Sequence, residues 1–300
     1  MYIILGYLGF GNYGDEILAN LLEARLKAKY GSKAVIKRLS SKTSWLEHLQ
    51  VIFKCKKVFA IGGMFQDLSG PFSIFYYSIV ILIAKLFSKE IIIFAQGIGP
   101  LQNPISRFVV DKIFRLANQI SVRDEDSSSF LQDCKIPHIA VYDWAWVLID
   151  EIDNIDIKKF LKISHNSVCI ALRCSQFIND EFIEKISSLI DSPKQKLIFL
   201  EMQKRDHEVN SRLLNSLKSN PEATFIRAED FSPQELIYLF KNYCSSIYTM
   251  RYHAGLIAKI AGIEVNLIDC DPKMVSLSKQ ISANTLEQLY KKAKLSEELL

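Results

Sequence analysis

The chain has 300 residues, of which 49% are hydrophobic, and its formal net charge is +4. This composition excludes a disordered chain and can bury a large core, and the length favours two domains over one. The 37 basic residues are scattered among 33 acidic ones without a block of one sign, which is only a weak signal for nucleic acid or an anionic membrane surface.

The six cysteines form no Cys-x-x-Cys pair and have no zinc-like spacing with histidine, which indicates reduced thiols and a cytoplasmic protein. The opening apolar run has no basic leader and stops at Gly6, so we expect a strand there and no signal peptide. The longest apolar segment, residues 72–87, is shorter than the roughly 20 residues of a membrane helix and predicts a buried helix. Peripheral contact with the inner face of the membrane stays open, because aromatic residues cluster at the start of this segment: Phe72, Phe75, Tyr76 and Tyr77.

Short β-branched runs alternate with amphipathic helices along the chain. This alternation predicts parallel sheets that are covered by helices on both faces. In the first half, strands are expected near residues 2–5, 34–38, 57–61, 91–95, 119–122 and 139–142. In the second half, they are expected near residues 167–172, 196–201, 223–227, 245–249 and 263–268.

The expected fold class is therefore α/β, with two Rossmann-like domains facing across a cleft. The polar, weakly patterned segment Asp150 to Asn166 is the expected junction, so residues 1–155 form the first domain and residues 165–283 the second. A last helix, within residues 284–300, could pack against either half. Ser232 to Glu235 has the pattern of a capping box and predicts the start of a helix in the second domain.

Unusual residues gather directly after the predicted strands. They are Gly9 to Asp15, Gly62-Gly63, Gln96 to Pro100, Arg123-Asp124, Asp143, Arg251 to His253 and Asp269 to Lys273. Because open α/β sheets bind ligands at the carboxyl ends of their strands, these residues predict the site. Arg251 and Lys273 would supply cations and His253 an acid or base, which suggests a substrate that carries phosphate or carboxylate.

The segment Gly9-x-Gly11-x-x-Gly14 formally matches the dinucleotide fingerprint, so a nicotinamide oxidoreductase is one alternative. Its surroundings disagree with that interpretation. Asp15 and Glu16 put carboxylates at the helix N-terminus, where a pyrophosphate would lie. The second strand also ends in Lys37-Arg38 rather than in the acid that would hold a ribose.

The segment Asp269-Cys270-Asp271 could be the metal-binding pair of a nucleotide-sugar transferase. Pro272 and Lys273 follow at once, so we favour an aspartate that caps the next helix. No set of His, Cys and Asp has ligand spacing, and we expect no metal.

Two further features have both a structural and a functional interpretation. Asp124 could cap a helix with Arg123 paired locally, or Arg123 could present its planar fork to an anion. Trp144 and Trp146 could stack against a sugar, but aromatic residues at this density favour the core.

With these motifs in place, nearly the whole chain resembles the polysaccharide pyruvyl transferase family. The segments that carry the resemblance occur in order: Gly6 to Glu16, Gly62 to Asp67, Gln96 to Leu101, Val122 to Ser127, Arg251 to Ala254 and Asp271 to Lys273. The chain departs from the family at Ile61, where glycine is usual, and at Tyr252, where leucine is usual. Neither departure removes a reactive group.

The resemblance implies the GT-B architecture and a transferase that moves a pyruvyl group from phosphoenolpyruvate to a sugar, forming a cyclic ketal and releasing phosphate. The sugar would belong to a cell-surface polysaccharide or to its lipid-linked precursor. Phosphoenolpyruvate is a co-substrate, and no cofactor is implied. His253 would be the general acid, while Arg123, Arg251 and Lys273 would hold the anionic groups, with the donor on the C-terminal side.

By the same resemblance, the N-terminal domain would bind the acceptor. The implied substrate contacts are Gly11, Asn12, Asp15, Gln66, Asp67, Gln96 and Asp271. Two alternatives stay open: a GT-B glycosyltransferase that uses a nucleotide-sugar, and a non-catalytic protein that binds sugar phosphates. No nucleic-acid partner is expected.

Overall fold

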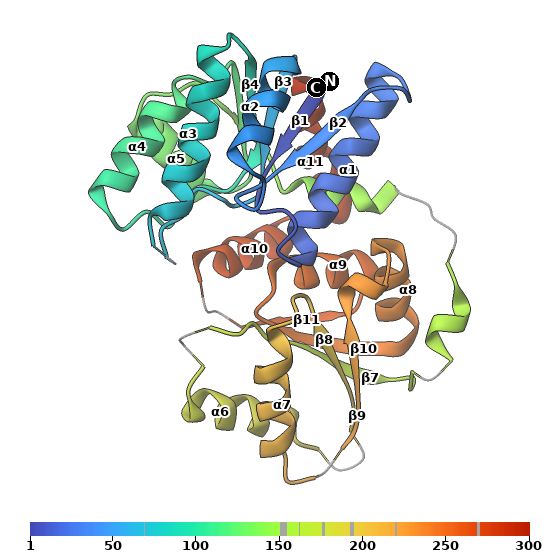
Figure 1. Cartoon of the computed structure of the whole chain (residues 1–300). Helices are drawn as coiled ribbons and strands as arrows, with labels where there is room; N and C mark the ends of the chain where they lie inside the picture. The colour runs from blue at the N-terminus through green and yellow to red at the C-terminus, as the bar shows by residue number, and fades with distance from the viewer. Residues whose placement is uncertain are drawn as a thin grey trace. The chain divides into compact units, whose positions relative to one another are not determined.

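The structure is a computed structural model, and it describes residues 1–68, 70–150, 155–161, 163–175, 178–192, 195–219, 221–268 and 271–300. The chain forms two compact units (Figure 1). The N-terminal unit contains Met1–Val147 and Glu287–Leu300, and the C-terminal unit contains Leu148–Leu286.

The N-terminal unit is built on a parallel sheet whose strands, within the described part of the chain, lie in the order β2-β1-β3-β4-β5-β6. These strands are β1 (Tyr2–Leu5), β2 (Ile36–Leu39), β3 (Lys57–Ile61), β4 (Glu90–Gln96), β5 (Gln119–Val122) and β6 (Ile139–Ala140). Strand β6 is shorter than expected because Asp143 turns the chain into a 3-10 helix, where its carboxylate accepts a hydrogen bond from the backbone N–H of Ala145.

Helices cover both faces of this sheet. They are α1 (Tyr13–Tyr30), α2 (Trp45–Lys54), α3 (Phe72–Leu86), α4 (Pro104–Phe114), α5 (Glu125–Asp133) and α11 (Leu286–Lys294). Figure 1 shows α3 and α4 on one side of the sheet and α1 and α11 on the other. Alternate strand residues such as Ile3, Val58 and Ile91 point to one face and form a buried core with Ile74 and Ile81 of α3.

The C-terminal unit repeats this plan with a parallel sheet in the order β11-β10-β7-β8-β9 among the residues that are described. Its strands are β7 (Ser167–Ala171), β8 (Lys196–Glu201), β9 (Glu222–Arg227), β10 (Cys244–Thr249) and β11 (Glu264–Leu267). Its α-helices are α6 (Asp180–Ile190), α7 (Asp206–Ser216), α8 (Pro233–Tyr243), α9 (Tyr252–Ala261) and α10 (Pro272–Ala283). The predicted α/β class and the positions of the strands are confirmed.

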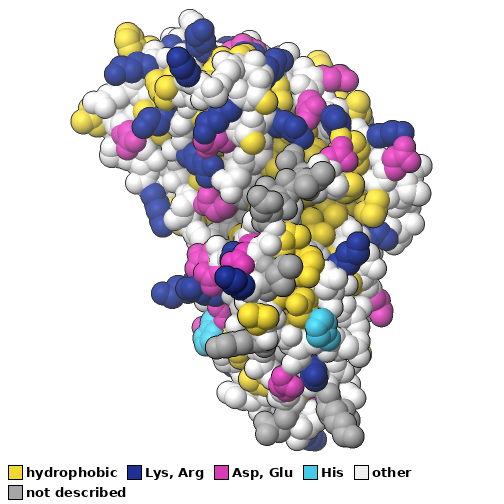
Figure 2. Space-filling view, turned by 90° about the vertical axis from the view of Figure 1, so that its right-hand side faces the viewer, with side chains coloured by type: hydrophobic (Ala, Val, Ile, Leu, Met, Phe, Trp, Pro, Cys, Tyr) yellow, Lys and Arg dark blue, Asp and Glu magenta, His cyan; other side chains and the backbone are white. Residues whose placement is uncertain are grey.

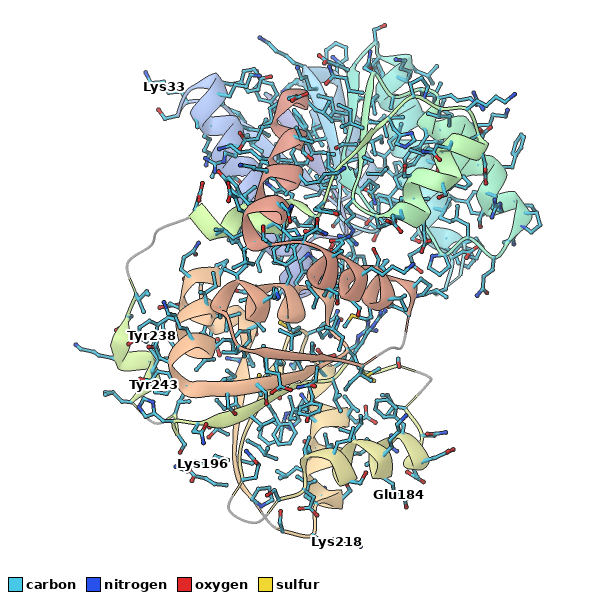
Figure 3. All side chains as sticks on the ribbon, turned by 180° about the vertical axis from the view of Figure 1, so that it is seen from behind. Lys33, Glu184, Lys196, Lys218, Tyr238 and Tyr243 are labelled. Carbon is cyan, nitrogen blue, oxygen red and sulfur yellow. The ribbon has the colours of Figure 1, made fainter. Side chains whose placement is uncertain are left out.

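Short 3-10 helices complete the chain: η1 (Trp144–Asp150), η2 (Ile157–Phe160), η3 (Ala228–Asp230) and η4 (Leu295–Leu299). The aromatic ring of Phe160 in η2 packs against Tyr238 and Tyr243 of α8, with ring centroids 5.2 and 5.7 Å apart. Figure 3 shows these two tyrosines beside η2. His165 stacks on Tyr243 with a centroid distance of 4.3 Å, so this cluster lies at the amino ends of the strands, away from the expected site.

The predicted capping box at Ser232 is confirmed. The backbone N–H of Glu235 donates to the Ser232 hydroxyl at 3.2 Å, and the Glu235 carboxylate accepts from the backbone N–H of Ser232 at 2.8 Å. Each residue therefore satisfies an N–H group that would otherwise have no partner at the start of α8.

The core interpretation of the two neighbouring tryptophans is also confirmed. Trp144 and Trp146 are buried, and Trp144 packs edge-on against Phe94 of β4 with centroids 5.1 Å apart. Neither ring can serve as a sugar platform. The first segment of the N-terminal unit ends directly after the two tryptophans, at Val147, whereas the sequence placed the first boundary at residue 155.

The C-terminal segment belongs to the N-terminal unit rather than forming a part of its own. The expected single helix ends at Lys294 and continues as η4, which packs on β4 and β5. The hydroxyl of Tyr30 in α1 donates to the carbonyl of Leu300 at 2.5 Å, and Arg25 pairs with Glu297 at 3.3 Å. Both chain ends therefore lie side by side, as Figure 1 shows.

Charges on the surface are mixed, as their scatter in the sequence predicts. Figure 2 shows Lys and Arg side chains interspersed with Asp and Glu over one face of the molecule. Across the described ranges, every helix is either too short or too polar to cross a membrane.

Replacing Leu299 by alanine should lower the free energy of unfolding of the N-terminal unit by about 2–4 kcal/mol, because its buried side chain fills space under η4. Leu295→Ala is the matched control: it lies in the same 3-10 helix, is 38% exposed and should cost less than about 1 kcal/mol. Urea unfolding followed by tryptophan fluorescence isolates this unit, since Trp45, Trp144 and Trp146 are the chain's three tryptophans. Equal losses in the two variants would contradict the packing described for η4.

Candidate functional site

Arg251 and His253 follow strand β10, as the sequence predicts. The backbone N–H of Arg251 donates to the Thr249 hydroxyl at 2.8 Å, and helix α9 begins one residue later at Tyr252. Gly255 lets this helix approach β11 closely, because a Cβ there would lie 2.9 Å from a methyl carbon of Leu267. The carboxyl end of β10 therefore presents Arg251 and the first turn of α9.

The guanidinium of Arg251 forms a buried ion pair with Asp206. Its Nε donates to one carboxylate oxygen of Asp206 at 2.9 Å, and its Nη2 donates to the other. Both side chains are buried. The pKa of Arg251 lies below its usual value. Burial is the main cause, and like-charge repulsion from Arg173 and Arg205 adds to it, while the adjacent Asp206 carboxylate raises the pKa and offsets part of the decrease. Two further arginines thus lie within electrostatic reach.

Asp206 also ties together loops from two other strands. It accepts hydrogen bonds from the backbone N–H groups of Gln203, after β8, at 3.0 Å and of Cys174, after β7, at 3.4 Å. Asp206 was not among the predicted site residues, because in the sequence it resembles an ordinary acid in the first turn of a helix. Its fixed position makes it the residue that orients Arg251.

Arg173 is a second residue that the sequence analysis missed. It lies just beyond β7, is half-buried, and its Nη1 donates to the carboxylate of Asp271 at 3.3 Å. Asp271 in turn accepts from the backbone N–H groups of Lys273 at 2.8 Å and Met274 at 3.2 Å. The predicted helix cap at Asp271 is confirmed, and its role in binding substrate stays a prediction. Asp269 and Cys270 lie outside the described residues.

We call Arg173, Arg205 and Arg251 the C-terminal cation site. Lys273 is connected to it through Asp271, which binds both the Arg173 guanidinium and the backbone N–H of Lys273. Asp206 and Asp271 offset part of its charge, so the site keeps an excess of positive charge. In the described part of the chain, no cluster of three or more His, Cys, Asp or Glu residues could hold a metal ion. Arginine forks suit phosphate and carboxylate groups, so this edge of the sheet can bind an anion.

His253 lies in the first turn of α9, two residues after Arg251. Its ring is partly buried and meets the ring of Tyr252 edge-on, with centroids 5.3 Å apart. An imidazole in this position can donate or accept a proton beside the cation site.

Arg123 follows β5 in the N-terminal unit and is also held by a buried acid. Its Nη1 donates to the carboxylate of Asp143 at 2.5 Å, and both residues are buried. The guanidinium packs on Gly97, where a Cβ would lie 2.8 Å from Nε. Asp124 caps α5, as the structural interpretation expected, but the main partner of Arg123 is distant in sequence rather than local.

The loop after β1 is fixed by carboxylates. Asn12 Nδ2 donates to Asp15 at 2.5 Å, and Asp15 lies against Gly62, where a Cβ would be only 2.7 Å from its oxygen. Glu16 accepts from the backbone N–H of Gly9 at 2.6 Å. Because these acids occupy the start of α1, the dinucleotide interpretation of the glycine pattern is disfavoured on physical grounds.

Asp67 joins the loops after β3 and β4. It accepts from the backbone N–H groups of Gln102 at 2.9 Å and Asn103 at 2.8 Å. Burial raises its pKa, but these hydrogen bonds outweigh burial and leave the pKa below its usual value. Gln66 lies beside it and accepts from the backbone N–H of Leu68 at 2.9 Å.

Gln96, an expected contact to the acceptor, is the last residue of strand β4. Its side chain is fully buried, and its Nε2 donates to the carbonyl of Gly97 at 3.0 Å. The side chain does not reach the surface in this structure, and its contact to an acceptor sugar stays a prediction. Gly11, which has a positive φ of 67°, and Asn12 remain on the accessible loop after β1, and half-buried Asp15 follows in the first turn of α1.

Comparison with solved structures shows a shared fold at low sequence identity. The crystal structure of Anabaena Alr3699/HepE with UDP-glucose has a TM-score of 0.55 and 10% identity, and the match covers 100% of both chains. The same protein with UDP and glucose gives 0.53 and 10%, over 100% of this chain and 94% of that one. LpCGTa with UDP gives 0.50 and 11%, over 98% and 90%. These likenesses support two Rossmann-like domains of the GT-B kind.

Comparison of the sequence with known proteins identifies the family. No curated protein shows significant similarity to the chain. The sequence profile of the polysaccharide pyruvyl transferase family, however, matches residues 12–272. This match begins at Asn12, the last residue of the loop after β1. It includes the loops that carry Asp67 and Arg123 and the segments after β7, β8 and β10 that carry Arg173, Asp206 and Arg251. The chain therefore belongs to the polysaccharide pyruvyl transferase family.

Proposed function

We propose that this transferase moves the pyruvyl group of phosphoenolpyruvate onto a sugar of a cell-surface polysaccharide or of its lipid-linked precursor. The observation that carries the proposal is the C-terminal cation site, where Arg251 is oriented by buried Asp206 next to His253. Family membership supports the reaction class. Phosphoenolpyruvate acts as a co-substrate, and the proposal needs no cofactor.

The charge of the donor matches the charge of this site. Phosphoenolpyruvate carries a carboxylate and a phosphate, and the site holds more cations than carboxylates. Arg251 uses Nε and Nη2 for Asp206, so its Nη1 is outside that pair and can meet an anionic oxygen. Arg173 and Lys273 would hold the remaining oxygens.

His253 would supply the proton that phosphoenolpyruvate needs. Protonation of the methylene carbon makes C2 electrophilic, and a sugar hydroxyl attacks C2 and gives up its own proton. The bond between C2 and the phosphate oxygen then breaks, with its electrons leaving on phosphate. A second hydroxyl attacks C2 and closes the cyclic ketal. The proton of the first hydroxyl restores the His253 imidazolium, and the proton of the second leaves on phosphate. Positioned acids of this kind typically contribute 10²–10⁴-fold to a rate.

The acceptor would be contacted by the accessible loops of the N-terminal unit, with Gly11, Asn12, Asp15 and Gln66 as the proposed residues. Arg123 is a less direct candidate than the sequence suggests. Alanine at Arg123 would leave Asp143 buried without its cation, at a cost of about 3–5 kcal/mol. We therefore assign Arg123 mainly to holding the loops after β4 and β5, with any contact to the donor resting on the family resemblance.

The direct test is release of phosphate from phosphoenolpyruvate across a panel of sugar acceptors. The proposal predicts phosphate release that depends on acceptor, together with a product that gains the mass of a pyruvyl ketal. Release of UDP from UDP-sugars instead would assign the protein to glycosyl transfer. Binding of phosphoenolpyruvate without turnover on any acceptor would favour a non-catalytic role.

Replacing Arg173 by glutamine should weaken phosphoenolpyruvate binding by about tenfold to a hundredfold, the value of a charge-assisted hydrogen bond of about 1.5–3 kcal/mol. The side chain is half-buried and not part of the Arg251–Asp206 pair, so the variant should fold. Arg212→Gln is the matched control, because Arg212 is exposed on α7 and pairs with Asp180. Calorimetric titration that finds the same affinity in both variants would remove Arg173 from the donor site.

Replacing His253 by glutamine should lower turnover by roughly 10²–10⁴ while donor affinity stays within a few-fold. His165→Gln is the control: His165 is exposed at the amino end of the same sheet and bonds the carbonyl of Asn242 at 3.0 Å. Turnover, affinity and melting temperature should be measured on both proteins. Loss of thermal stability with near-normal turnover in His253→Gln would show that the imidazole only supports the start of α9.

A further inference from the structure

Helix α3 is apolar on its solvent face as well as on its buried face. The buried face carries Ile74, Tyr77, Ile81 and Ala84. The opposite face exposes a stripe at intervals of three and four residues: Phe72 83%, Phe75 37%, Ile79 46%, Leu82 44% and Leu86 75%. A helix on the surface normally has polar residues there, so this stripe is not explained by folding.

The stripe continues onto the two neighbouring helices. Helix α2 packs against α3 and exposes Leu46, Leu49 and Phe53, and α4 packs on the other side of α3 and exposes Ile105 and Phe108. Phe53 meets Phe87 edge-on with ring centroids 5.9 Å apart, which joins the ends of α2 and α3. We call the exposed apolar residues of α2, α3 and α4 the apolar face.

The sequence analysis expected four aromatic residues at the start of this segment, and two of them turn inward. Tyr77 is buried, and its hydroxyl donates to the carbonyl of Gly6 at 3.0 Å. Tyr76 donates to the carbonyl of Ser40 at 2.6 Å, and burial raises its pKa to about 12. Phe72 and Phe75 remain on the surface, so the apolar face is longer than the sequence suggested but does not include those tyrosines.

Cations border the apolar face. Lys54 and Lys85 lie in the last turns of α2 and α3, and Lys112 of α4 lies 5.1 Å from the ring centroid of Phe108. Helix α3 contains no acidic residue. The acids of the neighbouring helices are Glu47 and Asp111, and Asp111 is already paired with Arg115 at 2.8 Å. An anionic partner is therefore favoured.

We propose that the apolar face docks on an anionic lipid bilayer, with α3 lying in the plane of the membrane surface. Exposed Phe, Trp and Leu side chains beside lysines are the pattern of an interfacial helix. Helix α3 has 15 residues and spans about 22 Å, less than the roughly 30 Å of a hydrocarbon core, so it rests on the membrane. A symmetric contact with a second copy is disfavoured, because it would bring the same lysines toward each other.

The apolar face begins next to the loop that follows the carboxyl end of strand β3 in the N-terminal unit. Phe72 starts α3 directly after the loop that carries Gln66 and Asp67, and the hydroxyl of Ser73 donates to the carbonyl of Gln66 at 3.3 Å. Docking would place that loop near the lipid headgroups. The inference does not rest on the proposed function, since lipid binding can be measured without donor or acceptor.

The test is co-sedimentation of the full chain with vesicles of phosphatidylcholine, with and without phosphatidylglycerol. The wild-type protein should bind the mixed vesicles, and Leu86→Glu should weaken binding about tenfold or more, because a charge replaces an apolar side chain that would enter the lipid. Leu189→Glu is the control: Leu189 is 56% exposed on α6 of the other unit, and its replacement should leave binding unchanged. Circular dichroism checks that both variants are folded.

A second arm tests the charge. Lys54→Gln and Lys85→Gln should each lower binding to the mixed vesicles about fivefold and leave binding to pure phosphatidylcholine unchanged. Equal binding of wild type and Leu86→Glu would overturn the proposal, as would wild-type protein that ignores both kinds of vesicle. A wild-type dimer in sedimentation velocity that Leu86→Glu converts to monomer would overturn it in favour of a second copy.

Discussion

The buried ion pair between Arg251 and Asp206 is the interaction on which the candidate site depends. Removing two charges from water costs several kcal/mol for each ion, and only good geometry with further hydrogen bonds offsets that cost. Here the pair is bidentate, and the backbone N–H groups of Gln203 and Cys174 also bind the carboxylate. The pair thus joins the loops after β7, β8 and β10 and fixes a cation at the edge of the sheet.

The N-terminal unit also contains a buried arginine–aspartate pair that connects loops at the end of its sheet. The Arg123–Asp143 pair connects the loops after β5 and β6, and Gly97 leaves room for the guanidinium. Asp67 bridges two further loops through backbone N–H groups. Polar residues that the sequence marks as unusual therefore act first as supports for the loops, and those that remain accessible are the ones available to a substrate.

Much of the fold could be predicted because its signals are local. Period-two and period-3.6 patterns located the strands and helices, and the caps at Ser232 and Asp271 follow from short motifs. The strand-end rule marked Arg251, His253 and Lys273 as candidate residues without any contact information.

The remaining features depend on contacts between distant parts of the chain. Asp206 meets Arg251 across 45 positions, so neither residue indicates the other in the sequence. Burial of Gln96 is set by the sheet and not by its own neighbours. The sequence pointed to the aromatic start of α3 but not to the full exposed stripe, because a helix that is apolar all round has the pattern of a buried one. The C-terminal segment joins the N-terminal unit through the buried residues Leu289 and Leu299, a choice that its amphipathic pattern leaves open.

The central claim is that the Arg251–Asp206 pair, besides joining the loops of the C-terminal unit, holds a cation for an anionic donor. The decisive measurement is calorimetric titration of phosphoenolpyruvate into the double variant Arg251→Met/Asp206→Asn, beside its melting temperature. The asparagine carbonyl can still accept from the backbone N–H groups of Gln203 and Cys174, and removing both charges together leaves no buried charge without its partner. The account predicts a folded protein whose donor affinity falls by about tenfold or more. A folded double variant that binds phosphoenolpyruvate as tightly as the wild type would contradict it.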